Sequence, residues 1–130
     1  MDIAPRALCV VLLHSTDEPD HAVAGIDVAR AAAAAVERGL GLPHRTTLFL
    51  DVEGVRLAAK GVTETLSSGG RPDVTELLTS FTRAGGEILV ARDAWTQRGY
   101  LDDALVPGAR LVSRQVLGEM TARSYAFVTY

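Results

Sequence analysis

A short apolar segment, with glycines before it and a charged turn after it, constrains this chain more than any other feature. The segment Gly85–Gly99 reads GGEILVARDAWTQRG. Its first two glycines predict the end of a helix, Glu87–Ala91 predicts a short buried strand, and Arg92–Arg98 predicts a polar turn that leads into another helix. In a parallel α/β sheet, ligand-binding groups gather just beyond the carboxyl ends of the strands. We therefore expect the functional site to lie directly after Ala91.

The first third of the chain shows the same alternation of strand and helix. The run Ala7–Leu13 (ALCVVLL) is apolar throughout and rich in β-branched residues, which is typical of a strand covered on both faces. A helix is predicted over His21–Arg38, with Asp20 as its cap, because polar residues recur there at a spacing of three to four. Thr46–Val52 (TTLFLDV) predicts the second strand. These segments fit a sheet that is enclosed between helices.

The middle of the chain predicts irregular structure followed by a well-defined helix. Arg56–Lys60 predicts a short helical turn, and Gly61–Pro72 predicts an exposed loop because it contains three glycines and no periodic apolar pattern. Asp73 then predicts the cap of a helix, in which Glu76 can complete a capping box. The buried stripe of this helix is expected to contain Val74, Leu77, Leu78, Phe81 and Ala84.

The remaining elements complete the sheet. Ala109–Val112 predicts a fourth strand, Arg114–Arg123 a helix capped by Ser113, and Tyr125–Thr129 a last strand. The alternation of strands and helices predicts right-handed crossovers and a parallel sheet with helices on both faces.

Composition limits the size and the partners of this protein. The chain has 130 residues, of which 48% are hydrophobic, so we expect one domain over residues 1–130. The net charge is only −3, and the basic residues are scattered, which argues against nucleic acid or a membrane surface as a partner. The longest apolar runs are far shorter than the roughly 20 residues that span a bilayer, and Ala7–Leu13 is a poor secretory signal. Cys9 is the only cysteine, which fits a reducing compartment, and a cytoplasmic protein is expected.

Five residues near predicted strand ends are candidates for binding a ligand. They are His14, Asp51, Arg92, Asp93 and Trp95. Arg92 can offer a planar set of donors to a carboxylate, phosphate or sulfur oxyanion, and Trp95 can form one wall of the pocket. This arrangement predicts a small anionic ligand. A surface ion pair beside a packing tryptophan is the alternative explanation for the same residues.

Other chemical classes find less support in the sequence. His14 and His44 are predicted at opposite edges of the sheet, and no metal-binding motif is present, so neither a metal nor another cofactor is predicted. Cys9 lies in the centre of an apolar strand, where it is expected to be a small buried hydrophobe. The chain contains no GxSxG, Walker or GxGxxG motif, and Ser67–Gly70 resembles a flexible loop more than a phosphate-binding loop.

Four segments, which follow one another in the order of a known family, cover nearly the whole chain. They are ALCVVLLHS, LFLDVEGVRLAAKG, DVTELLTSFTRAGGEILVARDAWTQRG and LVPGARLVSRQVLGEMTARSYAFVTY. Their order resembles the DsrE/DsrF-like family, which includes sulfur-relay subunits that serve tRNA thiolation and dissimilatory sulfur oxidation. The resemblance implies a three-layer α/β/α sandwich around a five-stranded, mainly parallel sheet. It also implies assembly into dimers, trimers or hexamers, and an active loop after Glu87–Ala91.

This chain departs from the family at the position that carries sulfur. The relay members that carry a persulfide have a cysteine on the active loop, and the position that looks equivalent here is Ala91. Cys9 lies elsewhere and does not inherit that role. We therefore expect a structural or small-anion-binding protein that is not an enzyme. The alternative is a sulfur-relay component or enzyme that uses the same cleft with His14, Asp93 or a partner's thiol.

Apolar residues in two regions favour assembly with other subunits. One region is the alanine-rich helix, and the other contains Tyr100, Leu101, Leu105 and Val106. A small sandwich cannot readily cover this much apolar surface, so a homo-oligomer, or a complex with related subunits, is predicted.

Overall fold

The computed structural model describes residues 7–39, 45–123 and 125–130. In these ranges the chain forms a five-stranded sheet with the order β4-β3-β2-β1-β5, in which every pairing is parallel. The strands are β1 (Ala7–Leu12), β2 (Arg45–Leu50), β3 (Glu87–Ala91), β4 (Ala109–Val112) and β5 (Tyr125–Thr129). The α-helices are α1 (Pro19–Glu37), α2 (Val62–Leu66), α3 (Val74–Arg83), α4 (Arg92–Gln97) and α5 (Val116–Ala122), and the 3₁₀ helices are η1 (Val52–Ala58) and η2 (Asp102–Ala104).

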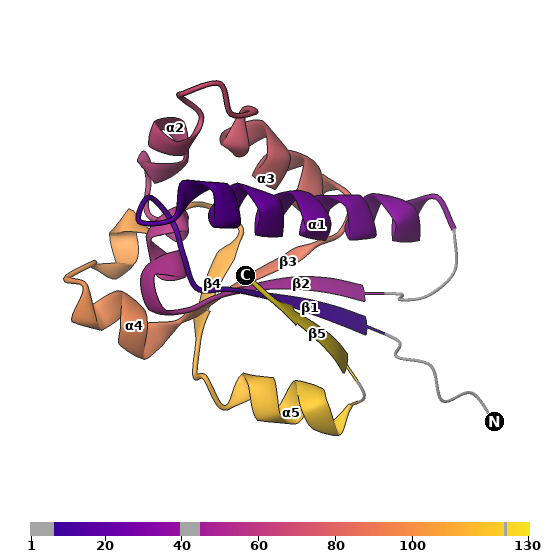
Figure 1. Cartoon of the computed structure of the whole chain (residues 1–130). Coiled ribbons are helices and arrows are strands. Elements are labelled where there is room, and N and C mark those ends of the chain that lie inside the picture. Colours follow the sequence, from indigo (N-terminus) through magenta and orange to yellow (C-terminus); the bar gives the residue numbers. More distant parts are fainter. Residues whose placement is uncertain (1–6, 40–44, 124) are drawn as a thin grey trace.

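Helices cover both faces of the sheet. Figure 1 shows α1 and α3 side by side on one face and α5 on the opposite face. The central strand β2 is consequently buried from Thr46 to Leu50, as expected of a parallel strand between two helical layers. The α/β sandwich predicted from the sequence is confirmed.

Several element boundaries match their predictions. The strands β3, β4 and β5 begin and end at the predicted residues. At the start of α3, the Asp73 side chain accepts a hydrogen bond of 3.1 Å from the backbone N–H of Glu76. Val74 and Phe81 of the predicted stripe are fully buried. Local signals therefore determine this part of the fold.

Two helix starts differ from their predictions. The helix α1 begins at Pro19, so Asp20 lies in its first turn and does not cap it. Proline is favoured at this position because its fixed φ suits the helix and its missing N–H would have had no helical partner. The helix α5 begins at Val116 because Arg114 and Gln115 form a turn. Ser113 stabilises that turn by accepting a 3.2 Å hydrogen bond from the N–H of Gln115.

The segment between β2 and α3 is more ordered than its composition predicted. The strand β2 ends at Leu50, before the predicted Val52, and the helical turn predicted over Arg56–Lys60 begins earlier, as η1 at Val52. The predicted loop is wrong over Val62–Leu66, which forms α2. Leu66 is buried there, and the hydroxyls of Thr63 and Thr75 lie 2.8 Å apart. Contacts with α3 stabilise this helix, although its own sequence shows no periodic pattern.

One glycine allows η1 to pack against the end of β1. A Cβ at Gly54 would collide with the backbone oxygen of Leu12. The same oxygen accepts a 3.1 Å hydrogen bond from the N–H of Asp51. The carboxyl ends of β1 and β2 are thereby held together, and Asp51 lies at this edge.

Candidate functional site

A bidentate ion pair at the carboxyl edge of the sheet joins Asp51 to Arg114. The Nε and Nη2 atoms of Arg114 donate to the two carboxylate oxygens of Asp51 at 2.6 and 2.7 Å. The backbone N–H of Val52 donates to the same carboxylate at 2.7 Å. Asp51 follows β2 and Arg114 follows β4, whereas β3 lies between these strands. The bidentate pair therefore reaches across the end of β3.

This pair keeps its charges at neutral pH. Burial acts to raise the pKa of Asp51, but the hydrogen bonds from Arg114 and Val52, together with the positive charges of Arg114 and Arg98, lower the pKa below its usual value. The hydrogen bonds with Asp51 raise the pKa of Arg114, and the charge of Asp93 adds to this effect. The side chain of Asp51 is 7% exposed and that of Arg114 is 52% exposed. Arg114 thus joins a buried carboxylate to the surface.

Arg92 and Asp93 lie at the start of α4 and are exposed. The Nη1 atom of Arg92 lies 3.7 Å from an oxygen of Asp102, which is too long for a hydrogen bond. Both side chains of this pair are more than half exposed. The donors of Arg92 are therefore available to a ligand, and the nearby charge of Asp93 makes the surroundings less positive.

Trp95 has a different environment from the other candidates. It is fully buried, and its ring stacks on Tyr100 with the ring centres 4.6 Å apart. The hydroxyl of Tyr100 accepts a 3.2 Å hydrogen bond from Arg56. In this structure Trp95 packs inside the protein and does not form a wall of an open pocket.

A second charged network connects η1 to α4. Glu53 accepts hydrogen bonds from the Nε atoms of Arg56, at 2.6 Å, and Arg98, at 3.0 Å. Arg98 also donates to the backbone oxygen of Ala94 at 3.1 Å. The hydrogen bond from Arg56 is the main reason why the pKa of Glu53 lies below its usual value. These contacts join η1, which directly follows Asp51, to the end of α4.

His14 makes its polar contact within its own loop. Its Nδ1 atom lies 2.9 Å from the carboxylate of Asp17. His44 lies outside the described residues. Among residues 7–39, 45–123 and 125–130, no three histidine, cysteine or acidic side chains are grouped in a way that could hold a metal ion. In the same ranges, no helix is both long enough and apolar enough to cross a membrane.

The single thiol of the chain is remote from solvent. Cys9 lies in β1 and is fully buried. Burial raises the pKa of this thiol to about 12. Since the thiolate is the reactive form of cysteine, Cys9 is a poor nucleophile in the folded protein.

The structure places the five predicted residues along one edge without bringing them into a single cluster. Asp51 contacts Arg114, Arg92 lies near Asp102, His14 contacts Asp17, and Trp95 is buried. The sequence did not indicate Arg114 as a site residue, because the pattern around it predicts a helix. Its position two residues after a predicted strand was the signal that could have placed it at this edge.

A parallel five-stranded sheet between two helical layers, with charged groups at its carboxyl edge, defines an α/β sandwich of the open-sheet class. A model of the DsrE/DsrF-like family matches residues 6–130, and the chain belongs to that family. No curated protein matches the chain.

Solved structures share the fold at low sequence identity. The ychN protein from E. coli is 17% identical, with a TM-score of 0.72 over 95% of this chain and 99% of that one. MTH1491 from Methanobacterium thermoautotrophicum, a protein of unknown function, is 13% identical, with a TM-score of 0.63 over 97% and 99% of the two chains. BT1422 from Bacteroides thetaiotaomicron, a conserved protein of unknown function, is 16% identical, with a TM-score of 0.63 over 94% of each chain. These similarities support the fold.

Proposed function

We propose that this protein is a cytoplasmic, homo-oligomeric member of the DsrE/DsrF-like family that does not itself carry sulfur and that binds a small anion at the carboxyl edge of its sheet. The state of Cys9 is the observation that carries the proposal. A sulfur relay requires an accessible thiolate that can accept and hand on sulfur. Cys9 is the only cysteine, is fully buried, and has a pKa raised to about 12. Ala91, at the end of β3, offers no thiol in its place.

Alkylation of the native protein tests the non-carrier role. Iodoacetamide at neutral pH should leave Cys9 unmodified in the folded protein and modify it after unfolding in urea. The control is Ala24→Cys, which adds a thiol at an exposed position of α1 and should be modified in the native state. If native Cys9 reacts as fast as the thiol in this control, the proposal is wrong. A sulfur-relay role, the alternative within the family, would then be favoured.

Arg92 supports the anion-binding part of the proposal. It is 53% exposed, and Asp102, the acidic side chain that lies 3.7 Å away, is beyond hydrogen-bonding distance. An exposed guanidinium can offer two parallel donors to a carboxylate, phosphate or sulfate group. Arg114 is less suitable because Asp51 occupies two of its nitrogens.

Exposed apolar side chains support the oligomeric part. Leu101 is 72% exposed, and Phe127 and Val128 are exposed on β5, which is an edge strand. Such side chains are often covered by another subunit. Light scattering at micromolar concentration should give a mass above that of one 13.8 kDa chain. A monomeric mass would contradict this part of the proposal.

A further inference from the structure

A groove of about 390 Å³ lies between α2, α3 and the segment that leads into β4. This volume falls within the range of roughly 300–1,000 Å³ that is usual for small-molecule sites. None of the five candidates at the carboxyl edge lines the groove. A ligand bound here would therefore contact none of those five side chains.

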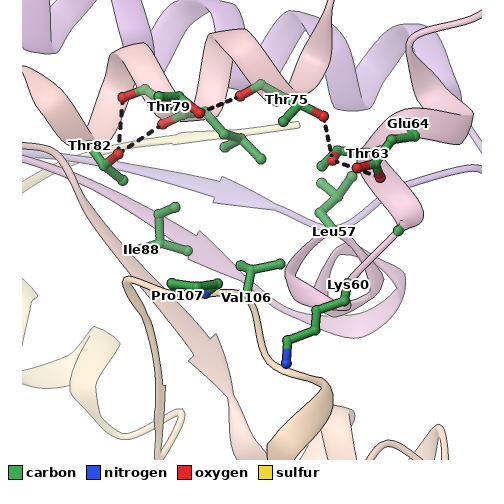
Figure 2. Close-up of a pocket in the computed structure, with 12 residues that line it drawn as sticks. Leu57, Lys60, Thr63, Glu64, Thr75, Thr79, Thr82, Ile88, Val106 and Pro107 are labelled. Carbon is green, nitrogen blue, oxygen red and sulfur yellow. Dashed lines mark hydrogen bonds between the residues drawn. The ribbon is translucent and has the colours of Figure 1, made fainter.

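The groove has one apolar side and one hydroxyl-bearing side. Figure 2 shows Thr75, Thr79 and Thr82 in a row along α3, opposite Ile88 and Pro107. Ile88 belongs to β3 and is almost fully buried, so it forms the floor. A molecule that fits this groove must combine an apolar body with a polar edge.

The hydroxyls of Thr79 and Thr82 already donate within α3 and can accept hydrogen bonds from a ligand. Thr79 donates its only hydroxyl proton to the backbone oxygen of Thr75 at 2.9 Å. Thr82 donates to the backbone oxygens of Thr79, at 3.0 Å, and Leu78, at 3.2 Å. Because a hydroxyl has one proton and two lone pairs, the lone pairs remain for a ligand.

Two further hydroxyls meet where α2 approaches α3. The hydroxyls of Thr63 and Thr75 share a 2.8 Å hydrogen bond, and Thr63 also donates to Glu64 at 3.5 Å. Either hydroxyl can be the donor in the shared bond, so one of these two protons is already used. This end of the groove also contains Lys60, whose ammonium donates to the backbone oxygen of Asp103 at 2.9 Å. Lys60 and Glu64 carry opposite charges, so the lining has no net charge.

We propose that this groove binds a small uncharged molecule with an apolar body and hydrogen-bond donors along one edge, such as a primary amide. The apolar body covers Ile88, Val106 and Pro107, and the donors face the hydroxyl oxygens of Thr79 and Thr82. Because Lys60 and Glu64 bring opposite charges to the lining, a charged ligand of either sign would meet one like charge as well as one unlike charge, which favours an uncharged molecule.

A pair of matched probes tests this proposal. Benzamide has two amide protons to donate, whereas N,N-dimethylbenzamide has the same ring and carbonyl but no donor. In a titration followed by ¹⁵N–¹H NMR, benzamide should shift the amide signals of Thr79, Thr82 and Ile88 in a saturable way. The dimethyl compound should bind about three- to ten-fold more weakly, as expected from the loss of a neutral hydrogen bond.

Matched variants locate the site. Thr79→Val keeps the shape of the side chain and should weaken benzamide about three- to ten-fold. Thr121→Val is the control, because Thr121 is an exposed helical threonine with the same type of bond, 3.0 Å to the oxygen of Leu117, on α5. It should leave the affinity unchanged. If Thr79→Val loses its dispersed spectrum, Thr82→Val is measured in its place. Equal binding of both probes, shifts confined to other residues, or unchanged affinity in the groove variant would each overturn the proposal.

Discussion

Two arginine–aspartate pairs at the same edge of the sheet differ in almost every physical respect. Arg114 and Asp51 form two hydrogen bonds of 2.6 and 2.7 Å around a buried carboxylate. Arg92 and Asp102 are 3.7 Å apart, and both are exposed to solvent. A buried charge depends on its partner, whereas an exposed pair contributes little to stability because water competes for both groups. The comparison separates a group that maintains the fold from one that is free to bind.

Removal of each arginine should give the largest difference between the pairs. Arg114→Met leaves Asp51 buried with only the N–H of Val52 as a partner, and should lower the free energy of unfolding by about 2–3 kcal/mol. Arg92→Met should lower it by less than about 0.5 kcal/mol. Urea unfolding at pH 7 measures both changes. Equal losses would show that the two pairs are energetically alike.

The pH dependence of stability should identify Asp51 as the group responsible. Its pKa is lower in the folded than in the unfolded protein, so its contribution is fully present above the unfolded value of about 3.9. That contribution is lost as the pH falls through the folded-state pKa. Asp51→Asn should therefore cost about 1–2 kcal/mol at pH 7 and progressively less below about pH 4.

The control for this experiment is the Arg114→Met background. The bonds from Arg114 are the main lowering influence on the pKa of Asp51. In that background, the loss in free energy of unfolding caused by Asp51→Asn should no longer shrink at low pH. If it shrinks as much as in the parent protein, another group causes the dependence.

A smaller effect concerns the backbone beside the buried pair. Val52 donates to Asp51 and has a φ of 53°, a left-handed conformation that costs a β-branched residue roughly 1–3 kcal/mol. Val52→Gly should remove this strain and, after the entropy cost of glycine, stabilise the protein by about 0.5–1 kcal/mol. Val52→Ala keeps a Cβ and should gain less. Thermal unfolding would measure both variants, and a lower Tm for the glycine variant would argue against strain at this position.

The smallest expected effect is a change in Tm that tests whether Arg92 binds an anion. Sulfate near its dissociation constant should raise the Tm by about 1–2 °C, because binding to the folded state alone stabilises that state. Arg92→Met should abolish this rise. The control is Arg110→Met, since Arg110 is also exposed and lies 3.2 Å from Glu87. An unchanged response in the Arg92 variant would place the anion elsewhere.

The sequence predicted those parts of the fold that local signals determine. The strand β3 is enclosed by glycines and a charged turn, and Asp73 directly caps α3. The helix α2 has no such signal, because its stability comes from burial of Leu66 and a contact with Thr75 of α3. Only the folded arrangement brings those residues together.

The candidate site was predictable as an edge but not as a set of contacts. Asp51, Arg92 and Asp93 all follow strands, so they share the carboxyl edge. The strand order decides that Arg114 reaches Asp51 across β3, and the sequence does not specify that order. Composition alone also cannot distinguish a tryptophan that lines a cleft from one that packs inside, as Trp95 does.

The pairing of β1 with β5 has a consequence for how the protein is made. These strands lie side by side from Ala7 and Tyr125 to Val11 and Thr129, although nearly the whole described chain separates them in sequence. As a ribosome releases the chain from its amino end, β1 can pair with β2 on one side long before β5 exists. Its other edge stays open during that interval, and an open apolar edge can pair with a foreign strand. We expect folding to be slow at this last step, so the nascent protein should depend on chaperones more than the mature one does.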